Sequence, residues 1–126
     1  MHESGENYLE TILILKMRKE KVRCVDIARK LGYSKASVSY GIGILKEEGC
    51  VTVKSGGSIE LTEKGYEIAE KIYERHQTLT RFFEIYAQVP RSIAEKDACK
   101  VEHILSEDTY QGIKKASRQI FSSSDC

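Results

Sequence analysis

The sequence predicts a mainly α-helical protein that contains one short β-hairpin. Apolar residues recur at helical spacing over most of the 126 residues, as they do where amphipathic helices pack on a core. Strand-like alternation is confined to residues 50–54 and 58–61, which flank Gly56-Gly57, a pair typical of hairpin turns. Together these patterns give a helical fold with a single two-stranded sheet.

Three helices are expected before the hairpin. The first covers residues 5–19, and the second covers residues 25–31 and ends at Gly32, a residue that suits a helix C-terminus. The third follows Ser34, which has the side chain of an N-cap, and extends to about residue 48. The spaced apolar residues are Leu9, Ile12, Leu13, Leu15 and Met17 in the first helix and Val38, Ile42 and Leu45 in the third.

This order of helices, turn, helix and hairpin is that of a winged helix-turn-helix, in which the third helix reads DNA. Charge agrees with it: residues 16–54 have a net charge of +6, whereas the whole chain has +1. A basic segment in an otherwise acidic chain suits a nucleic-acid partner. Gly41 and Gly43 do not favour the third helix, because each glycine lowers the stability of a helix by about 1 kcal/mol relative to Ala.

Three further helices are expected after the hairpin. They cover residues 62–86, residues 92–105 after the break at Pro90, and residues 107–120 after Ser106, which has the chemistry of a cap. The first of them is too long for a small winged domain to cover. The tail over residues 122–126 is expected to be disordered. The longest helix has an apolar stripe of Ile68, Ile72, Leu79, Phe82 and Phe83.

Cys99, Glu102 and His103 place a thiol, a carboxylate and an imidazole within five residues. On one helix these positions fall within an arc of about 100°, and such a mixed set of ligands can hold a divalent transition metal. A buried cysteine beside a solvated Glu–His pair is the alternative. His76, Glu10 and Asn7 lie on other expected helices that would complete a coordination shell by packing beside this one.

Nearly end to end, the chain resembles the diphtheria toxin repressor family of metal-dependent transcription regulators, in the short form without an SH3-like domain. The manganese transport regulators belong to this form. The resemblance implies a winged helix-turn-helix DNA-binding domain over residues 1–63 and a helical metal-binding and dimerisation domain over residues 64–121. The matching segments are residues 6–12, 26–31, 34–39, 61–65, 73–76 and 97–106.

The resemblance implies metal ligands at Glu10, His76, Cys99, Glu102 and His103. Asn7 falls where relatives have Asp or Met, and its side chain offers only a neutral carbonyl oxygen. Thr80 and Glu95 fall where the iron-type members have a Glu and a His in an ancillary site, so that site is altered.

Cys99 indicates which metal the site would bind. Iron-type members have Cys at this position and manganese-type members have Glu. A thiolate favours Fe(II), Co(II) or Zn(II) over the harder Mn(II). We therefore expect Fe(II) as the physiological metal and Mn(II) next, with Zn(II), Co(II) or Ni(II) binding in vitro.

DNA contacts are expected at the start of the third helix and at the tip of the hairpin, the two places where a winged domain meets bases and phosphates. These residues are Ser34, Lys35, Ser37, Ser39 and Tyr40 on the helix and Lys54 and Ser55 on the hairpin.

The function expected from these features is that of a cytoplasmic, metal-activated repressor of iron or manganese uptake genes. It would bind an inverted-repeat operator in double-stranded DNA as a homodimer, with no membrane partner. The alternative is a winged-helix factor that senses an organic ligand or thiol oxidation. A metalloenzyme is disfavoured, since the chain lacks a Gly-rich phosphate loop and an H-E-x-x-H motif.

Overall fold

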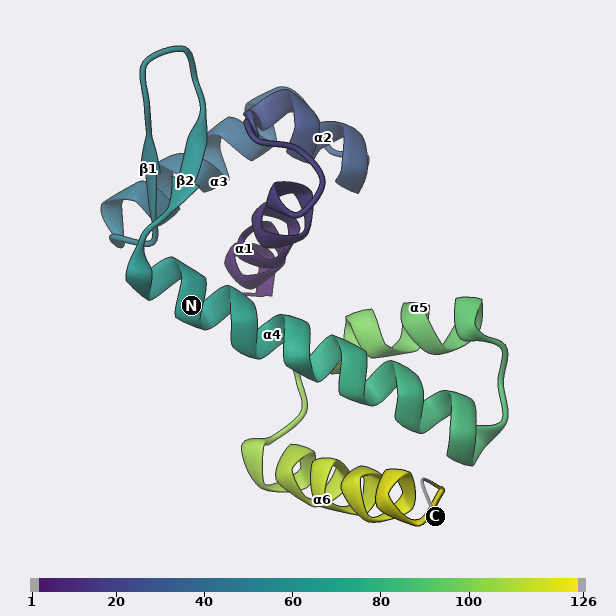
Figure 1. The fold of residues 1–126 in the computed structure, drawn as a ribbon. Helices are drawn as coiled ribbons and strands as arrows, with labels where there is room; N and C mark the ends of the chain where they lie inside the picture. The colour runs from purple at the N-terminus through teal and green to yellow at the C-terminus, as the bar shows by residue number, and fades with distance from the viewer. Residues whose placement is uncertain (1–2, 125–126) are drawn as a thin grey trace. The chain divides into compact units, whose positions relative to one another are not determined.

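The computed structural model describes residues 3–124, which form two compact units (Figure 1). The units divide between Lys71 and Ile72. This division falls inside helix α4 (Glu63–Phe82), whereas the boundary expected from the sequence lies at its beginning. The mainly helical fold class is confirmed.

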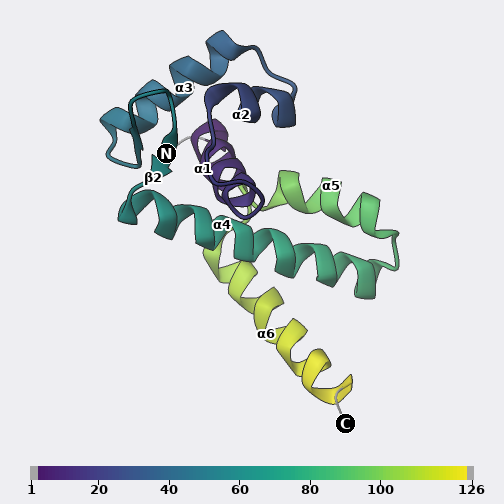
Figure 2. The ribbon, with the colours of Figure 1, turned by 45° about the horizontal axis from the view of Figure 1, so that its top comes forward.

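The first unit is a winged helix-turn-helix (Figure 2). Its hairpin is antiparallel, with Thr52 paired to Glu60 at its centre. The backbone N–H of Ile59 also donates to the carbonyl of Val22 at 2.7 Å, which attaches the segment before the second helix to the sheet. The elements are α1 (Glu3–Lys16), α2 (Cys24–Leu31), α3 (Lys35–Glu47), β1 (Val51–Val53), β2 (Ile59–Leu61) and the first half of α4.

The turn between α2 and α3 forms as its sequence predicts. Gly32 ends α2 with φ 73°, a left-handed conformation that favours glycine. The Ser34 hydroxyl accepts a hydrogen bond from the backbone N–H of Ser37 at 3.1 Å, which caps α3. The face of α3 expected to be buried is buried, and it consists of Val38, Ile42 and Leu45.

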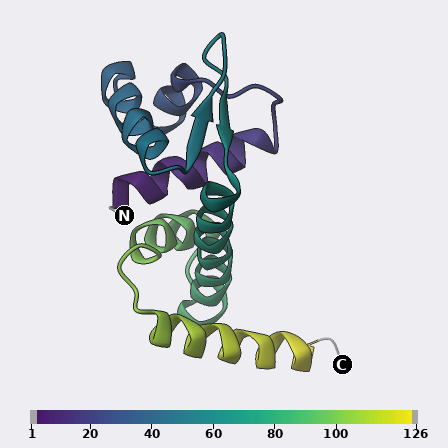
Figure 3. The same cartoon turned by 90° about the vertical axis from the view of Figure 1, so that its left-hand side faces the viewer.

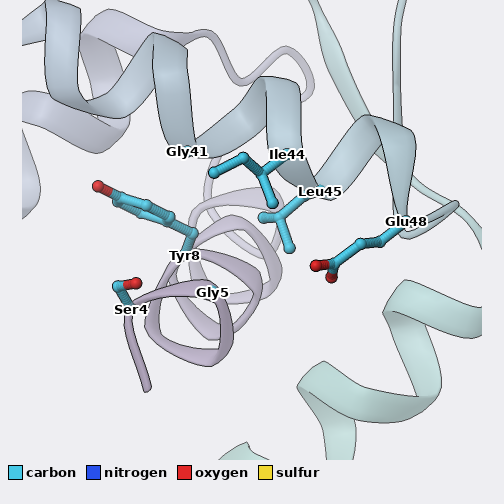
Figure 4. A pocket seen from close by; sticks show the side chains of 7 residues that line it. All are labelled: Ser4, Gly5, Tyr8, Gly41, Ile44, Leu45 and Glu48. Atoms are coloured by element: carbon cyan, nitrogen blue, oxygen red, sulfur yellow. The ribbon is translucent and has the colours of Figure 1, made fainter. Parts of the chain in front are cut away.

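Gly41 lets α1 and α3 approach each other closely. The ring of Tyr8 lies against this glycine (Figure 4), and an ideal Cβ built there would be 2.3 Å from Tyr8 Cε2. Gly43 faces open space, with nothing within 4 Å of its ideal Cβ. The helix penalty of Gly41 therefore has a packing reason, whereas nothing in the structure explains Gly43.

Thr62 and Gly65 join the hairpin to α4. The Thr62 hydroxyl donates to the carbonyl of Gly49 at 2.6 Å and accepts from the backbone N–H of Gly65 at 3.1 Å. A Cβ at Gly65 would lie 2.0 Å from the carbonyl oxygen of Cys50. This close approach of Cys50 to the first turn of α4 admits only glycine.

The second unit contains the rest of α4, a π-helical segment η1 (Phe83–Ala87), α5 (Arg91–Val101) and α6 (Glu107–Ser124). Figure 3 shows α5 beside α4. Ser106 caps α6 as predicted, since its hydroxyl accepts from the backbone N–H of Thr109 at 3.2 Å.

Several helix ends differ from the sequence-based expectation. α1 ends at Lys16 rather than at residue 19. α5 ends at Val101 rather than at residue 105. α6 continues through Ser124, where a disordered tail was expected from residue 122; residues 125–126 lie outside the described part. Within residues 3–124, no helix has both the length and the apolar character needed to cross a membrane.

Candidate metal centre and nucleic-acid interface

His76, Glu102 and His103 come together in the second unit. Nδ1 of His76, on α4, lies 3.0 Å from Oε2 of Glu102, which follows α5. Nε2 of His103 lies 3.3 Å from the other carboxylate oxygen, Oε1. The Glu102 side chain is fully buried, that of His103 is almost fully buried, and that of His76 is partly exposed. Two imidazoles thus flank one buried carboxylate.

The end of α5 places these side chains. Glu102 is the C-cap residue, and its backbone N–H donates to the carbonyl of Ala98 at 2.9 Å. The chain then turns over residues 102–104 instead of continuing as a helix. Glu102 and His103 therefore project from a helix terminus rather than from the face of a longer helix.

Arg75 holds this terminus against α4. Its Nη1 donates to the carbonyls of Glu102 at 3.1 Å and Leu105 at 2.8 Å. Nη2 pairs with Glu107 at 2.5 Å, and the guanidinium lies 4.8 Å from the ring centroid of Tyr110. Arg75 thus supplies donors to carbonyls of the turn that follows α5. This role of Arg75 was not predicted, since nothing in the sequence marks the residue except its position beside His76.

The donor set fits a divalent transition metal. Oε1 of Glu102 is buried and accepts no hydrogen bond from the described residues, although His103 lies nearby. Burying a carboxylate without full compensation is costly, and a cation bound between the carboxylate and the imidazoles would supply the missing charge. Imidazole and carboxylate suit several first-row metals. His76, Glu102 and His103 would hold such an ion.

Cys99 lies on α5, before the turn that presents Glu102 and His103. Its side chain is exposed on α5, whereas Ala94 and Ala98 form the buried face of that helix. The arc expected for Cys99, Glu102 and His103 required one helix through all three, and α5 ends before the last two.

The remaining sequence-predicted ligands occupy different surroundings. On α1, Glu10 is buried and Asn7 is partly buried. Thr80 is buried on α4, and its hydroxyl donates to the carbonyl of His76 at 2.7 Å. Glu95 is exposed and pairs with Arg91 at 3.2 Å. Thr80 and Glu95 thus both engage groups of their own helices.

The residues expected to contact DNA are exposed on the first unit. Ser34, Lys35, Ser37, Ser39 and Tyr40 lie at the start of α3, and Tyr40 is 75% exposed. The Ser34 oxygen is engaged in capping. Lys54 and Ser55 begin the hairpin turn, where Gly56 and Gly57 have φ of 88° and 86°. The start of α3 and the tip of the hairpin are therefore accessible to a partner.

Comparisons with known families cover both units. Residues 1–58 match the family described as iron dependent repressor, N-terminal DNA binding domain. Residues 62–120 match iron dependent repressor, metal binding and dimerisation domain. The DNA-binding match thus precedes the metal-binding and dimerisation match, which is the order that the sequence predicts.

The chain is similar to curated relatives over shares of their length that range from 49% to 92%. The chain is 32% identical over 115 residues to an uncharacterized HTH-type transcriptional regulator of Methanocaldococcus jannaschii, covering 90% of this chain and 92% of that protein. It is 30% identical over 109 residues to the transcriptional regulator MntR of Escherichia coli O157:H7, covering 86% of this chain and 70% of MntR. The iron-dependent repressor IdeR of Mycobacterium tuberculosis is 28% identical over 113 residues, covering 90% of this chain and 49% of IdeR.

Solved structures have the same fold. The structure of the manganese regulator SloR superimposes with a TM-score of 0.79 at 27% identity, covering 88% of this chain and 52% of SloR. The chain thus spans about half the length of SloR and of IdeR. With both halves matched to iron dependent repressor domains, the chain belongs to the diphtheria toxin repressor family of metal-dependent transcription regulators.

Proposed function

We propose that this protein is a transcriptional repressor that a divalent metal, iron or manganese, activates for DNA binding. The observation that carries the proposal is the buried Glu102 carboxylate between two imidazoles, in a chain that also contains a winged helix-turn-helix. Membership in a metal-dependent family favours a metal as the signal over an organic ligand or thiol oxidation.

The proposed ligands are Glu10, His76, Cys99, Glu102 and His103. His76, Glu102 and His103 are supported by their geometry, whereas Glu10 and Cys99 rest on the family resemblance. When bound, the metal supplies positive charge to a buried carboxylate. Fe(II) is the proposed physiological ion because of Cys99, and Mn(II) is the next candidate.

Glu10 is the ligand proposed to couple metal binding to DNA binding. His76, Cys99, Glu102 and His103 all belong to the second unit, whereas Glu10 belongs to the DNA-binding unit. A ligand shifts an equilibrium only if it binds one state better than the other. A metal bound by the second unit alone would have no ligand in the DNA-binding unit, so the direct coupling is assigned to Glu10.

Operator binding titrated with Fe(II), Mn(II) and Zn(II) under anaerobic, reducing conditions tests this function. Glu10→Gln should reduce metal-dependent operator affinity more than it reduces total metal uptake, and His76→Ala should reduce both. Glu67→Gln, at an exposed position of α4, is the matched control. Metal-independent operator binding by the wild-type protein would refute the proposal.

The DNA interface is tested separately. Ser37→Ala or Tyr40→Ala should change sequence preference, because side chains at the start of a recognition helix reach base edges. Lys54→Ala should weaken binding to all sequences and reduce its salt dependence, as expected of a phosphate contact. A changed preference at one base pair with an unchanged salt slope for Lys54→Ala would overturn the assignment of the hairpin.

The proposed partner is an inverted-repeat operator bound by a homodimer in the cytoplasm. The family match to a dimerisation domain supports self-association, and a two-fold symmetric dimer reads two half-sites of opposite orientation.

A further inference from the structure

Arg75 connects the turn that carries two candidate metal ligands to the first turn of α6. Its Nη1 donates to the carbonyls of Glu102 and Leu105, at the two ends of the turn over residues 102–105, here called the ligand turn. Its Nη2 pairs with Glu107, the first residue of α6, and its guanidinium lies over the ring of Tyr110. All of these residues belong to the second unit. One side chain thus contacts both the ligand turn and the helix that follows it.

The α6 contacts are what hold the guanidinium of Arg75 in place. An arginine side chain is long and has many rotamers, so it orients other groups only when it is itself held. Its planar fork donates in several directions at once, and here one nitrogen faces the ligand turn while the other faces α6. The position of the ligand turn therefore depends on α6 as well as on α4.

Of the two α6 contacts, that of Tyr110 holds Arg75 more firmly. The Glu107 side chain is 66% exposed, and ion pairs with so exposed a partner stabilise little. Tyr110 is only 3% exposed, and a cation over a desolvated aromatic ring is held more strongly than one over an exposed ring. The Tyr110 hydroxyl lies within hydrogen-bonding distance of Glu74 at 3.3 Å and Thr78 at 3.4 Å, both on α4. The ring is thus itself fixed to α4.

These contacts bear on metal binding because the ligand turn presents Glu102 and His103. His76, the third ligand supported by geometry, is adjacent to Arg75 in the chain. Groups that orient metal ligands from outside the coordination shell commonly change metal affinity by about 10- to 100-fold when they are replaced. Arg75 acts on the backbone of the ligand turn, so it would set the positions of two ligands together.

We propose that Arg75 is a positioning residue for the metal, and that Tyr110 makes metal affinity depend on the docking of α6 against α4. The inference rests on the proposed function, since it takes Glu102 and His103 as metal ligands. Linkage is reciprocal, so a helix whose docking raises metal affinity is itself stabilised when the metal binds. Metal binding is therefore expected to reduce the opening of α6, a helix that contains none of the proposed ligands.

Binding of Co(II) to the full chain, measured anaerobically against a competing chelator, tests the role of Arg75. Arg75→Gln and Arg75→Lys should each weaken Co(II) binding at least about tenfold, because neither side chain replaces the planar guanidinium. Their Co(II) absorption spectra should also change, since the spectrum reports the geometry of the ligands around the ion. Lys71→Gln removes a cation from an exposed position one turn earlier on α4, so its affinity and spectrum should equal those of the wild type.

A second pair of variants tests the role of α6. Tyr110→Phe keeps an aromatic ring against the guanidinium and should bind Co(II) nearly as tightly as the wild type does. Tyr110→Leu removes the ring and should weaken binding by about fivefold. Hydrogen exchange over residues 107–114 should slow when Co(II) binds the wild-type protein, and it should slow less in Tyr110→Leu.

Wild-type Co(II) affinity and spectrum in Arg75→Lys would overturn the inference. Lowered stability of the Arg75 variants in urea, with unchanged Co(II) affinity, would also overturn it, because it would mark a purely structural role. If Arg75→Gln does not fold, Arg75→Lys and the Tyr110 pair decide the question. Equal affinities of Tyr110→Leu and Tyr110→Phe would refute the part assigned to α6. A wild-type chain that binds neither Co(II) nor Mn(II) would instead refute the proposed function itself.

Discussion

Gly41 and Gly43 stand two residues apart on α3 but meet different surroundings. A side chain at Gly41 would collide with the Tyr8 ring, whereas a side chain at Gly43 would meet open space. Sequence alone assigns both the same helix penalty, because propensity ignores partners that are distant along the chain. Only the packing of α1 on α3 separates them.

Replacement of each glycine by Ala should therefore have opposite effects. Gly43→Ala should raise the free energy of unfolding by about 1 kcal/mol, the helix-propensity difference. Gly41→Ala should lower it, because overpacking in a filled contact costs about 1–3 kcal/mol. Urea unfolding followed by circular dichroism measures both, and a stabilised Gly41→Ala would show that Tyr8 moves aside freely.

Cys99 is the residue on which the choice of metal depends. If Cys99 is a ligand, Cys99→Glu should move the activating preference from Fe(II) towards Mn(II), since a carboxylate is the harder donor. Cys99→Ala should weaken activation by every metal. Operator binding in metal-buffered solution measures both effects. If all metals activate Cys99→Ala as they activate the wild type, Cys99 is not a ligand. The site would then have only nitrogen and oxygen donors, and the thiolate argument for Fe(II) would no longer hold.

At the level of elements, local pattern predicted more than long-range contact did. The helices, the hairpin and the caps at Ser34 and Ser106 were predictable because periodicity and cap chemistry act within a few residues. The end of α5 was not, because the turn that follows it is held by Arg75, which donates to the carbonyls of Glu102 and Leu105, 27 and 30 residues later in the chain. The grouping of Cys99 with Glu102 and His103 at one metal stays a prediction.

The start of α2 makes stability depend on pH. Asp26 accepts hydrogen bonds from Lys19 Nζ at 2.8 Å and from the backbone N–H of Arg23 at 2.9 Å. The hydrogen bond from Lys19 lowers the pKa of Asp26 below its ordinary 3.8, and the backbone hydrogen bond from Arg23 contributes a smaller part. A lowered pKa stabilises the fold above the unfolded value and loses this contribution as pH falls through the folded value.

Asp26→Asn should consequently lower stability at neutral pH and flatten its decline between about pH 5 and pH 2. Thermal unfolding across this range measures the effect. Glu70→Gln, at an exposed position of α4, is the control and should retain the wild-type profile. Parallel profiles for Asp26→Asn and wild type would show that the ion pair contributes nothing.

For the whole molecule, the family resemblance contributed what pattern could not. His76 and Glu102 are 26 residues apart, and no local rule pairs them, yet their atoms lie within hydrogen-bonding distance.

Self-association is the prediction at this scale. The second unit exposes large apolar side chains on η1, on α5 and after it, namely Ile85, Tyr86, Ile93 and Ile104. Exposed apolar surface of this kind marks interaction sites. Analytical ultracentrifugation should show a dimer, and Ile93→Glu should shift it towards monomer, whereas Met17→Glu in the first unit should not. A monomeric wild type, with and without metal and operator, would contradict this.

The contacts of Arg75 have a consequence for how tightly a metal is taken up. The turn that presents Glu102 and His103 is already fastened to α4 through two carbonyls and the ion pair to Glu107. An incoming ion would therefore not need to order this loop, and the conformational entropy that ordering costs would already be spent in folding. Preorganisation of this kind favours tight binding, because less of the binding free energy is spent on ordering the ligands.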